Sequence, residues 1–359
     1  MLSLLVLLLP SASAGAKILE PIRLSKDKHT FVLADSGRRF VPWGFNYDHD
    51  ADGRLIEDYW DGEWAKVEKA FADMHRLGAN VVRIHLQFGK FMDAADKPND
   101  KQLQRLGDLL QLAERERLYL DLTGLGCYHK KDAPAWYDKL SEQDRWDAQA
   151  CFWEAVAGRC AKSNAVFCYD LMNEPVAPGN KVEAGGWLPG KPLGDSYFVQ
   201  LITLDPGDRT RPEIARQWIR RLARAIRKQD DRHLITVGMM PVLGMLPIES
   251  DKGDDLDFYC VHIYPQAKKV DDALTTLHGF AALGKPVVIE ETFPLSCSEE
   301  EFEAFMDKSR KDAVGWIGFF WGQTPEDLKD PKTLADVMTR NWLEFFQKKG
   351  KAFQAGDPY

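Results

Sequence analysis

The stretch "AVFCYDLMNEPV" (165–176) leaves two interpretations of this chain open. Its first eight residues are mostly apolar, as in a strand buried on both faces, and the run then meets Asn173 and Glu174. Pro175 follows at once and is expected to hold Glu174 in an extended conformation. The polar end is either an ordinary loop or the place where a strand presents an acid at the mouth of a barrel.

Strand-like apolar segments alternate with amphipathic helical segments on both sides of this stretch. The helical segments fall at 63–78, 101–117, 144–161, 212–230, 270–284, 298–310 and 334–349. The strand-like segments fall at 39–46, 79–88, 118–123, 165–172, 233–238, 257–264, 286–292 and 313–322. This α/β pattern predicts a (β/α)8 TIM barrel, although 239–255 shows no clear helix after the fifth strand.

Two further segments surround the predicted barrel. Residues 23–40 have the pattern of a β-hairpin that turns at Asp35-Ser36-Gly37, and we expect it to brace the N-terminal face. A long loop follows the fourth strand, from Val176 to about Thr210, and is rich in glycine, proline and aromatic residues. Loops of this length are usually functional or disordered, and this one is expected to wall off one end of a cleft.

The bulk composition favours a soluble protein with an uncharged partner. The 359 residues carry a formal net charge of −8, which argues against nucleic acid or an anionic membrane as partner. The six cysteines lack CxxC spacing, so the sequence predicts no metal site, and Cys168 and Cys260 are expected to be buried thiols. The sequence does not decide whether other cysteines pair.

The first residues have the pattern of a secretory signal peptide. An apolar run from Leu2 to Leu9 precedes small residues that fit a cleavage site, and the run is too short to span a bilayer. We therefore expect a leader at 1–16, a single domain at 17–359, and a monomer secreted to the extracellular space or periplasm.

Polar side chains gather where the predicted strands end. The sequence places Asn46, Arg83, His85, Asn173, Glu174, His262, Tyr264, Glu290, Glu291 and Trp321 at these ends. The carboxyl ends of barrel strands form the functional face of this fold. Two carboxylates at one mouth are what retaining glycoside hydrolysis requires, one as acid and the other as nucleophile, about 5–5.5 Å apart. Arg83 would keep the nucleophile ionised, and Trp321 would form a floor for the sugar.

The segments "VRIH", "YDLMNEP", "VHIYP", "KPVVIEET" and "FFWG" resemble glycoside hydrolase family 5. The resemblance runs from about Phe40 to Phe346. It implies that Glu174 is the acid/base and that Glu291 is the nucleophile. Glu290 falls at the family's variable position, and successive strand residues face opposite sides, so only one of the two glutamates is expected to reach the substrate.

The resemblance also implies a substrate and a set of contacts. The substrate is an oligo- or polysaccharide, a β-linked glucan or mannan, and no cofactor is needed. The residues implied to bind it are Asn46, Arg83, Asn173, His262, Tyr264 and Trp321, with His129 as a late counterpart of the histidine that the family often places directly after strand three. Sugar identity, linkage, and exo or endo action stay open.

Two other classes of protein compete with this interpretation. A catalytically silent carbohydrate-binding barrel would have lost Glu174 or Glu291, and both are present. A metal-dependent barrel hydrolase usually has a His-x-His on an early strand, whereas "RIHLQ" offers one histidine. The chain also lacks a glycine-rich phosphate loop.

Overall fold

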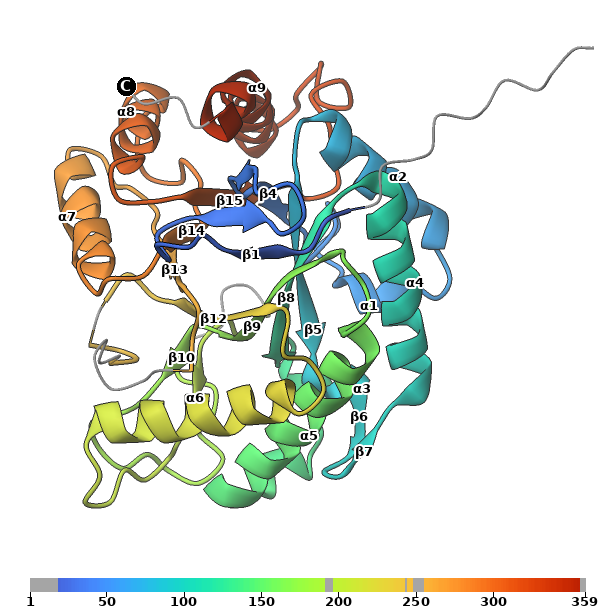
Figure 1. The fold of residues 1–359 in the computed structure, drawn as a ribbon, viewed down its shortest axis with the longest axis vertical. Coiled ribbons are helices and arrows are strands. Elements are labelled where there is room, and N and C mark those ends of the chain that lie inside the picture. Colours follow the sequence, from blue (N-terminus) through green and yellow to red (C-terminus); the bar gives the residue numbers. More distant parts are fainter. Residues whose placement is uncertain (1–18, 191–195, 243, 248–254, 356–359) are drawn as a thin grey trace, which may run out of the picture.

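Eight parallel strands close into a barrel in the computed structural model, which describes residues 19–190, 196–242, 244–247 and 255–355 (Figure 1). The strands follow one another around the barrel as β12-β13-β14-β15-β4-β5-β8-β9. Their bounds are β4 Trp43–Asn46, β5 Val81–Gln87, β8 Tyr119–Gly126, β9 Val166–Asn173, β12 Leu234–Met239, β13 Tyr259–His262, β14 Val287–Glu291 and β15 Gly315–Phe319. The predicted barrel is confirmed.

Helices surround the barrel and cover its outer face (Figure 1). The longer ones are α2 Trp64–Arg76, α4 Asp100–Glu116, α5 Glu142–Cys160, α6 Arg211–Arg227, α7 Val270–Ala281, α8 Glu299–Ser309 and α9 Leu334–Ala355, and two short ones are α1 Ile56–Tyr59 and α3 Phe88–Phe91. Reciprocal capping bonds between Thr210 and Glu213 start α6. As predicted, no helix lies between β12 and β13 within the described residues; residues 243 and 248–254 fall outside them.

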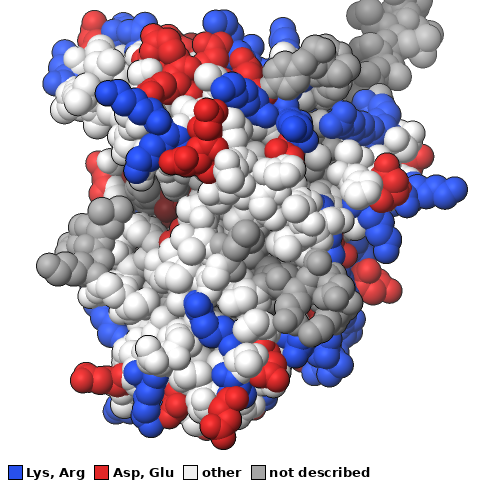
Figure 2. Space-filling view, turned by 90° about the vertical axis from the view of Figure 1, so that its left-hand side faces the viewer, with Lys and Arg blue, Asp and Glu red and all other residues white. Residues whose placement is uncertain are grey.

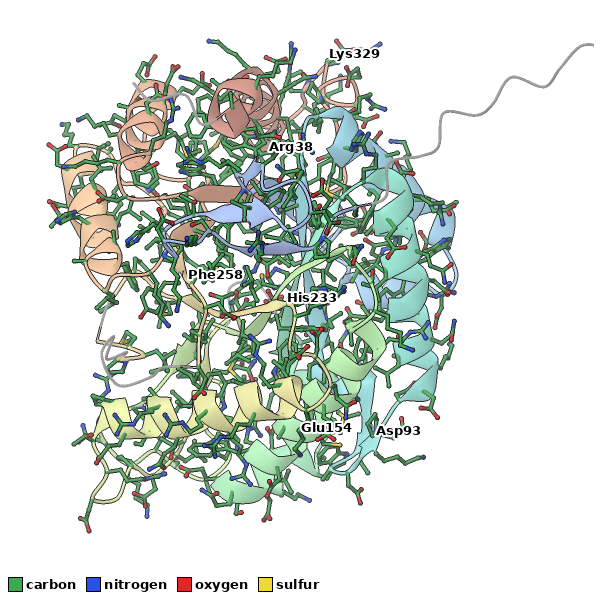
Figure 3. The ribbon with its side chains drawn as sticks, viewed as in Figure 1. Arg38, Asp93, Glu154, His233, Phe258 and Lys329 are labelled. Carbon is green, nitrogen blue, oxygen red and sulfur yellow. The ribbon has the colours of Figure 1, made fainter. Side chains whose placement is uncertain are left out.

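The N-terminal segment forms a small antiparallel sheet that closes the bottom of the barrel. It comprises β1 Ile22–Leu24, β2 Phe31–Leu33 and β3 Arg39–Phe40, one strand more than the predicted hairpin. The ring of Phe31 lies 5.2 Å from Phe167 and 5.0 Å from Phe258, both on the N-terminal side of barrel strands. Figure 3 shows Phe258 inside the outline of the molecule, whereas Asp93 and Lys329 lie near its edge. The expected brace is therefore present.

The long loop after β9 folds back onto the barrel mouth. A two-residue parallel pair, β10 Pro175–Val176 with β11 Gln200–Leu201, joins its two ends. Trp187 is buried against the Arg145 guanidinium, 4.2 Å away, so it does not face the cleft. Phe198, in contrast, packs against Tyr128 at a ring distance of 4.9 Å. A second short hairpin, β6 Met92–Ala94 and β7 Lys97–Pro98, lies beyond α3.

On the face in Figure 2, Lys and Arg side chains lie beside Asp and Glu side chains, so charges of both signs are mixed there.

All six cysteines are free thiols, and Cys168 and Cys260 are buried as predicted. Among the described helices, none has the length and apolar character needed to cross a bilayer. The predicted leader at 1–16 lies outside the described residues.

Candidate active site

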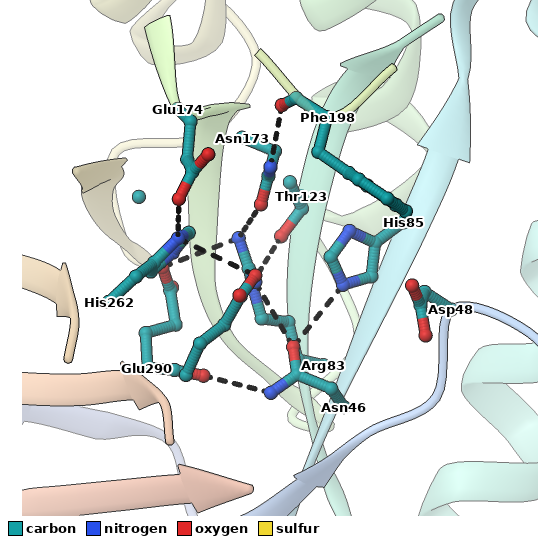
Figure 4. A network of polar contacts seen from close by, with 12 residues as sticks. Asn46, Asp48, Arg83, His85, Thr123, Asn173, Glu174, Phe198, His262 and Glu290 are labelled. Carbon is teal, nitrogen blue, oxygen red and sulfur yellow. Dashed lines mark hydrogen bonds and ion pairs between the residues drawn. The ribbon is translucent and has the colours of Figure 1, made fainter. Parts of the chain in front are cut away.

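A fully buried arginine, Arg83 on β5, organises the mouth of the barrel (Figure 4). Its guanidinium donates to Glu291 Oε1 at 2.6 Å, to Asp170 Oδ2 at 2.8 Å, and lies 3.4 Å from Glu290 Oε2. It also donates to the side-chain oxygens of Asn46, Thr123 and Asn173. Six side chains from four other strands thus converge on one cation. A buried charge is tolerated only when it is paired and hydrogen-bonded in this way.

Two carboxylates face each other across the mouth. Glu174, directly after β9, accepts from His262 Nδ1 at 3.0 Å. Glu291, the last residue of β14, accepts from Arg83 through Oε1 and from the Tyr264 hydroxyl through Oε2, the latter at 2.7 Å. A carboxylate oxygen of Glu174 lies within 4.8 Å of one of Glu291. Such a close approach of two carboxylate oxygens is compatible with the roughly 5–5.5 Å between the carboxyl groups of retaining glycosidases.

Strict alternation predicted that Glu290 and Glu291 would face opposite sides of β14. The structure differs from this prediction, because both side chains contact Arg83. The pairing of β13 with β14 shifts between Val261 and His262, so that Val261 opposes Ile289 while His262 opposes Glu291. Glu290 is the extra residue of this bulge, and both carboxylates contact Arg83. Glu290 is fully buried beneath the mouth, whereas Glu291 reaches the pocket. Position along the barrel axis, rather than the face of the strand, separates the two glutamates.

The expected extended conformation of Glu174 is also wrong. Its φ is +47°, in the left-handed region, and Trp321 beyond β15 has a φ of +49°. Such values are uncommon for residues other than glycine and cost of order 1–3 kcal/mol. Pro175 has no N–H to donate at this turn. The turn is held instead by the Glu174 N–H, which donates to the Gly238 carbonyl at 2.9 Å. The strained turn aims the carboxylate of Glu174 at His262.

The buried charges beneath the mouth alter each other's ionisation. Burial alone would lower the pKa of His262, but the charge of Glu291 and hydrogen bonds to Glu174 and Glu290 raise it to about 10. Burial works against ionised Glu290, yet the charge of Arg83 and the contact with His262 lower the pKa of Glu290. Burial, together with the charges of Glu290 and Asp170, raises the pKa of Asp121 well above its usual range. Burial and these neighbouring charges therefore favour the neutral form of Asp121.

A glycine makes room for this cluster. A Cβ added at Gly238 on β12 would lie 2.7 Å from Glu290 Oε2 and 2.9 Å from both the Arg83 guanidinium and His262 Nε2. The Gly238 N–H donates to Asp170 Oδ1 at 2.7 Å. Any side chain at position 238 would therefore push apart the ions that hold Glu291 in place.

The carboxylates open into a pocket of about 360 Å³, at the lower end of the usual range for small-ligand sites. Among the predicted site residues, those that line it are Asn173, Glu174, Tyr264, Glu291 and Trp321. The others lie elsewhere: Asn46, Arg83 and His262 form the buried layer beneath, and His129 is bonded to Asp132 outside the pocket. A larger groove of about 490 Å³ between α8 and α9 contains none of these residues.

Most of the remaining pocket wall was not predicted. Apart from His85, which the sequence placed at a strand end, this part of the wall is formed by Asp48, His49, Tyr128, Phe198, Phe293, Leu295 and Phe319. The Trp321 ring stacks on Phe319 at 5.1 Å and 6° and meets Phe293 edge-on. His85 lines the pocket, whereas His129 does not, and the His85 ring contacts both Asn46 and the Tyr128 hydroxyl. The position of His85 on the second strand, beside Arg83, was the available signal for it.

The same carboxylates could in principle hold a cation. Glu174, His262 and Glu291 place one ligand atom each within 4.8 Å of one another. However, His262 Nδ1 faces Glu174 and its Nε2 faces Glu290 at 3.2 Å, and its raised pKa keeps a proton on both nitrogens. A doubly protonated imidazole has no lone pair for a metal. The arrangement suits proton transfer and nucleophilic attack better than metal binding.

Comparison with known proteins assigns the family. The family model of cellulases, glycosyl hydrolase family 5, matches residues 45–325. The chain belongs to glycosyl hydrolase family 5, which confirms the resemblance found in the sequence. Mannan endo-1,4-beta-mannosidase A of Hypocrea jecorina is 24% identical over 340 residues, covering 78% of this chain and 66% of that protein. The chain thus spans slightly less than two thirds of the length of that relative.

Solved structures share the barrel at low sequence identity. An exo-beta-1,4-mannosidase from Opitutaceae bacterium strain TAV5 superposes with a TM-score of 0.66 at 17% identity, covering 93% of this chain and 63% of that one. A family 5 protein from Bifidobacterium longum, solved in complex with Manb1-4GlcNAc, superposes with a TM-score of 0.64 at 11% identity, covering 89% and 79%. These likenesses support the fold.

The protonation of His262 predicts how stability depends on pH. The fold raises the pKa of His262 from the ordinary value of 6.5 to about 10. The stabilisation of the folded state by protonated His262 is therefore fully present below pH 6.5. The contribution is lost as the pH rises through 10. In denaturant unfolding, the free energy of unfolding of the wild type should exceed that of His262→Gln, and this difference should become smaller from pH 6 to pH 10. The exposed His75 on α2 provides the control substitution. A His262→Gln difference that does not change with pH would contradict the ion pairing.

Proposed function

We propose that this protein is a retaining β-glycoside hydrolase that cleaves β-1,4-linked mannosides, with Glu174 as acid/base and Glu291 as nucleophile. One observation carries the proposal: two carboxylates lie within 4.8 Å of each other in one pocket, and only Glu291 is bonded to a guanidinium. The Arg83 cation favours the ionised form that a nucleophile needs. The family membership and the mannan-active relatives support both the reaction and the substrate class.

The first step forms a covalent intermediate. A carboxylate oxygen of Glu291 attacks the anomeric carbon, and the glycosidic C–O bond breaks as Glu174 gives its proton to the leaving oxygen. The Tyr264 hydroxyl and Arg83 hold the two oxygens of Glu291, which fixes the direction of attack. His262 Nδ1 lies 3.0 Å from Glu174 Oε1, so the His262–Glu174 pair holds a proton next to the leaving group.

The second step releases the sugar with its original configuration. Glu174, now a carboxylate, takes a proton from a water molecule as the water oxygen attacks the anomeric carbon. The bond to Glu291 breaks, and Glu291 returns to its ion pair with Arg83.

Asn173 is already held at both ends, by Arg83 through its oxygen and by the Phe198 carbonyl through its nitrogen. Its second N–H is positioned at the pocket wall for a sugar hydroxyl.

The shape and lining of the pocket favour short substrates. Its volume is small, and Phe198 from the long loop forms part of its wall. Phe319 and Phe293 support the Trp321 ring, which offers an apolar surface for a sugar ring. We therefore expect β-1,4-manno-oligosaccharides to be better substrates than long, branched polymers.

Removing either carboxylate should abolish turnover. Glu174→Gln and Glu291→Gln are expected to lower kcat on an aryl β-mannoside by roughly three orders of magnitude or more, with unchanged circular dichroism, because each removes a group used in the transition state. Azide should restore activity to Glu291→Gly, and the product should be the α-glycosyl azide. Glu290→Gln is the comparison: it should mainly lower the melting temperature, because it removes a buried partner of Arg83.

Three outcomes would contradict this assignment. Full activity in Glu291→Gln with none in Glu290→Gln would make Glu290 the nucleophile. Activity in both Glu174→Gln and Glu291→Gln would exclude the mechanism. A wild-type protein that binds manno-oligosaccharides without hydrolysing any β-glycoside would favour the alternative, a catalytically silent carbohydrate-binding barrel.

We also propose that the protein is secreted and acts as a monomer built from a single domain, residues 17–359. The apolar run and small residues at the N-terminus motivate this proposal. The intact mass of protein recovered from the medium or periplasm should match residues 17–359, and its elution volume should match one chain. Retention of residues 1–16, or recovery from the cytoplasm alone, would contradict export.

A further inference from the structure

A third carboxylate, Asp48, lines the pocket beside Glu174 and Glu291. It lies two residues beyond the end of β4 and only 5% of its surface is exposed. Figure 4 shows it next to His85, on the opposite side of the polar network from Glu174. Asp48 is therefore placed to contact a part of the ligand distant from the acid/base.

One oxygen of Asp48 is occupied and the other is open. Asp48 Oδ1 accepts from the His49 backbone N–H at 3.0 Å and contacts His49 Nδ1 at 2.8 Å. Asp48 Oδ2 has no hydrogen-bond partner among the residues that the structure describes. Burial would raise the pKa of Asp48, but the charge of His49 and its hydrogen bond lower it to about 2. The pocket thus contains an ionised acceptor with one oxygen that is not used by the loop.

Asp50, rather than Asp48 Oδ2, makes most of the polar bonds of the surrounding loop. Asp50 Oδ1 accepts from the backbone N–H groups of Asp52 and Arg54, at 3.0 and 2.9 Å. Its Oδ2 accepts from the Arg54 side chain at 2.9 Å and from Lys66 at 2.7 Å. The polar bonds of the loop thus converge on Asp50, and Asp48 Oδ2 remains available to a ligand.

We propose that Asp48 is a specificity-determining residue that accepts hydrogen bonds from hydroxyl groups of a neutral sugar in the pocket. The inference rests on the proposed function and names the class of sugar that this site accepts. Sugar hydroxyls are donors that match a free carboxylate oxygen. Three carboxylates line the pocket, so a uronic acid or a phosphorylated sugar would meet like charge there. The site therefore selects uncharged sugars that keep their hydroxyls.

The test compares Asp48→Asn with the wild type. The substitution preserves the side-chain shape and leaves one oxygen to face His49, while it turns the free acceptor into a donor. The control is Asp52→Asn in the same loop, because the Asp52 side chain is 76% exposed and lies outside the pocket. Melting temperatures of both variants establish that they are folded.

Two readouts separate sugar recognition from chemistry. The first is the kcat/KM for aryl β-mannosides in which single hydroxyls are replaced by fluorine, which cannot donate. The second is the Kd of β-1,4-mannotriose measured by calorimetry in the Glu291→Gln background. We expect Asp48→Asn to weaken mannotriose binding by roughly 10- to 150-fold, the effect of losing one hydrogen bond to a charged group. We also expect the penalty for fluorination at one hydroxyl to disappear in Asp48→Asn.

The outcomes distinguish this inference from the proposed function. An active wild type together with unchanged kcat/KM, Kd and fluorine penalties in folded Asp48→Asn would overturn the role of Asp48 alone. An inactive wild type whose mannotriose binding still depends on Asp48 would overturn the hydrolase and retain the sugar contact. Absence of mannotriose binding in every variant, or equal weakening by Asp52→Asn, would overturn the inference.

Discussion

The ion pair between Arg83 and Glu291 is the interaction on which the rest of the site depends. Arg83 has no exposed surface, and its guanidinium gathers side chains from β4, β8, β9 and β14. Breaking a buried pair by removing one partner typically costs about 3–5 kcal/mol, because it leaves an uncompensated charge. The same contacts that stabilise the barrel interior therefore also fix the proposed nucleophile.

This constraint extends to the backbone around the site. Gly238 is needed because a Cβ there would displace Glu290, Arg83 and His262. The bulge in β14 allows Glu290 to pair with Arg83 from below while Glu291 pairs with it from the pocket. The left-handed turn at Glu174 brings the second carboxylate to His262. Strain and bulges thus occur where the ion network requires them, and the eight-stranded barrel supports them.

The sequence predicted the barrel strands and the longer helices, because each depends on the local period of apolar residues, and it predicted an N-terminal hairpin where the structure has a three-stranded sheet. Glu174, Glu290 and Glu291 could be placed at the mouth because they lie at the ends of two such strands, and the family resemblance selected Glu291 over Glu290. The bulge at Glu290 and the φ of Glu174 could not be predicted from the sequence, since both depend on pairing with neighbouring strands. Asp48 and His49 lie in a loop without periodicity, so the sequence offered no signal for them. His129 was named as a late counterpart of the family's histidine after strand three, but it is bonded to Asp132 and does not line the pocket.

Covalent trapping with 2-deoxy-2-fluoro-β-mannosyl fluoride tests the central claim most directly. The fluorine at C2 slows hydrolysis of the glycosyl-enzyme, so the intermediate accumulates. Mass spectrometry of the digested protein should find the 2-fluoromannosyl group on Glu291, at one per chain, and prior substitution of Glu291 should prevent labelling. A label on Glu290 or Glu174, or steady turnover of active enzyme without any label, would contradict the assignment of Glu291 as the nucleophile held by Arg83.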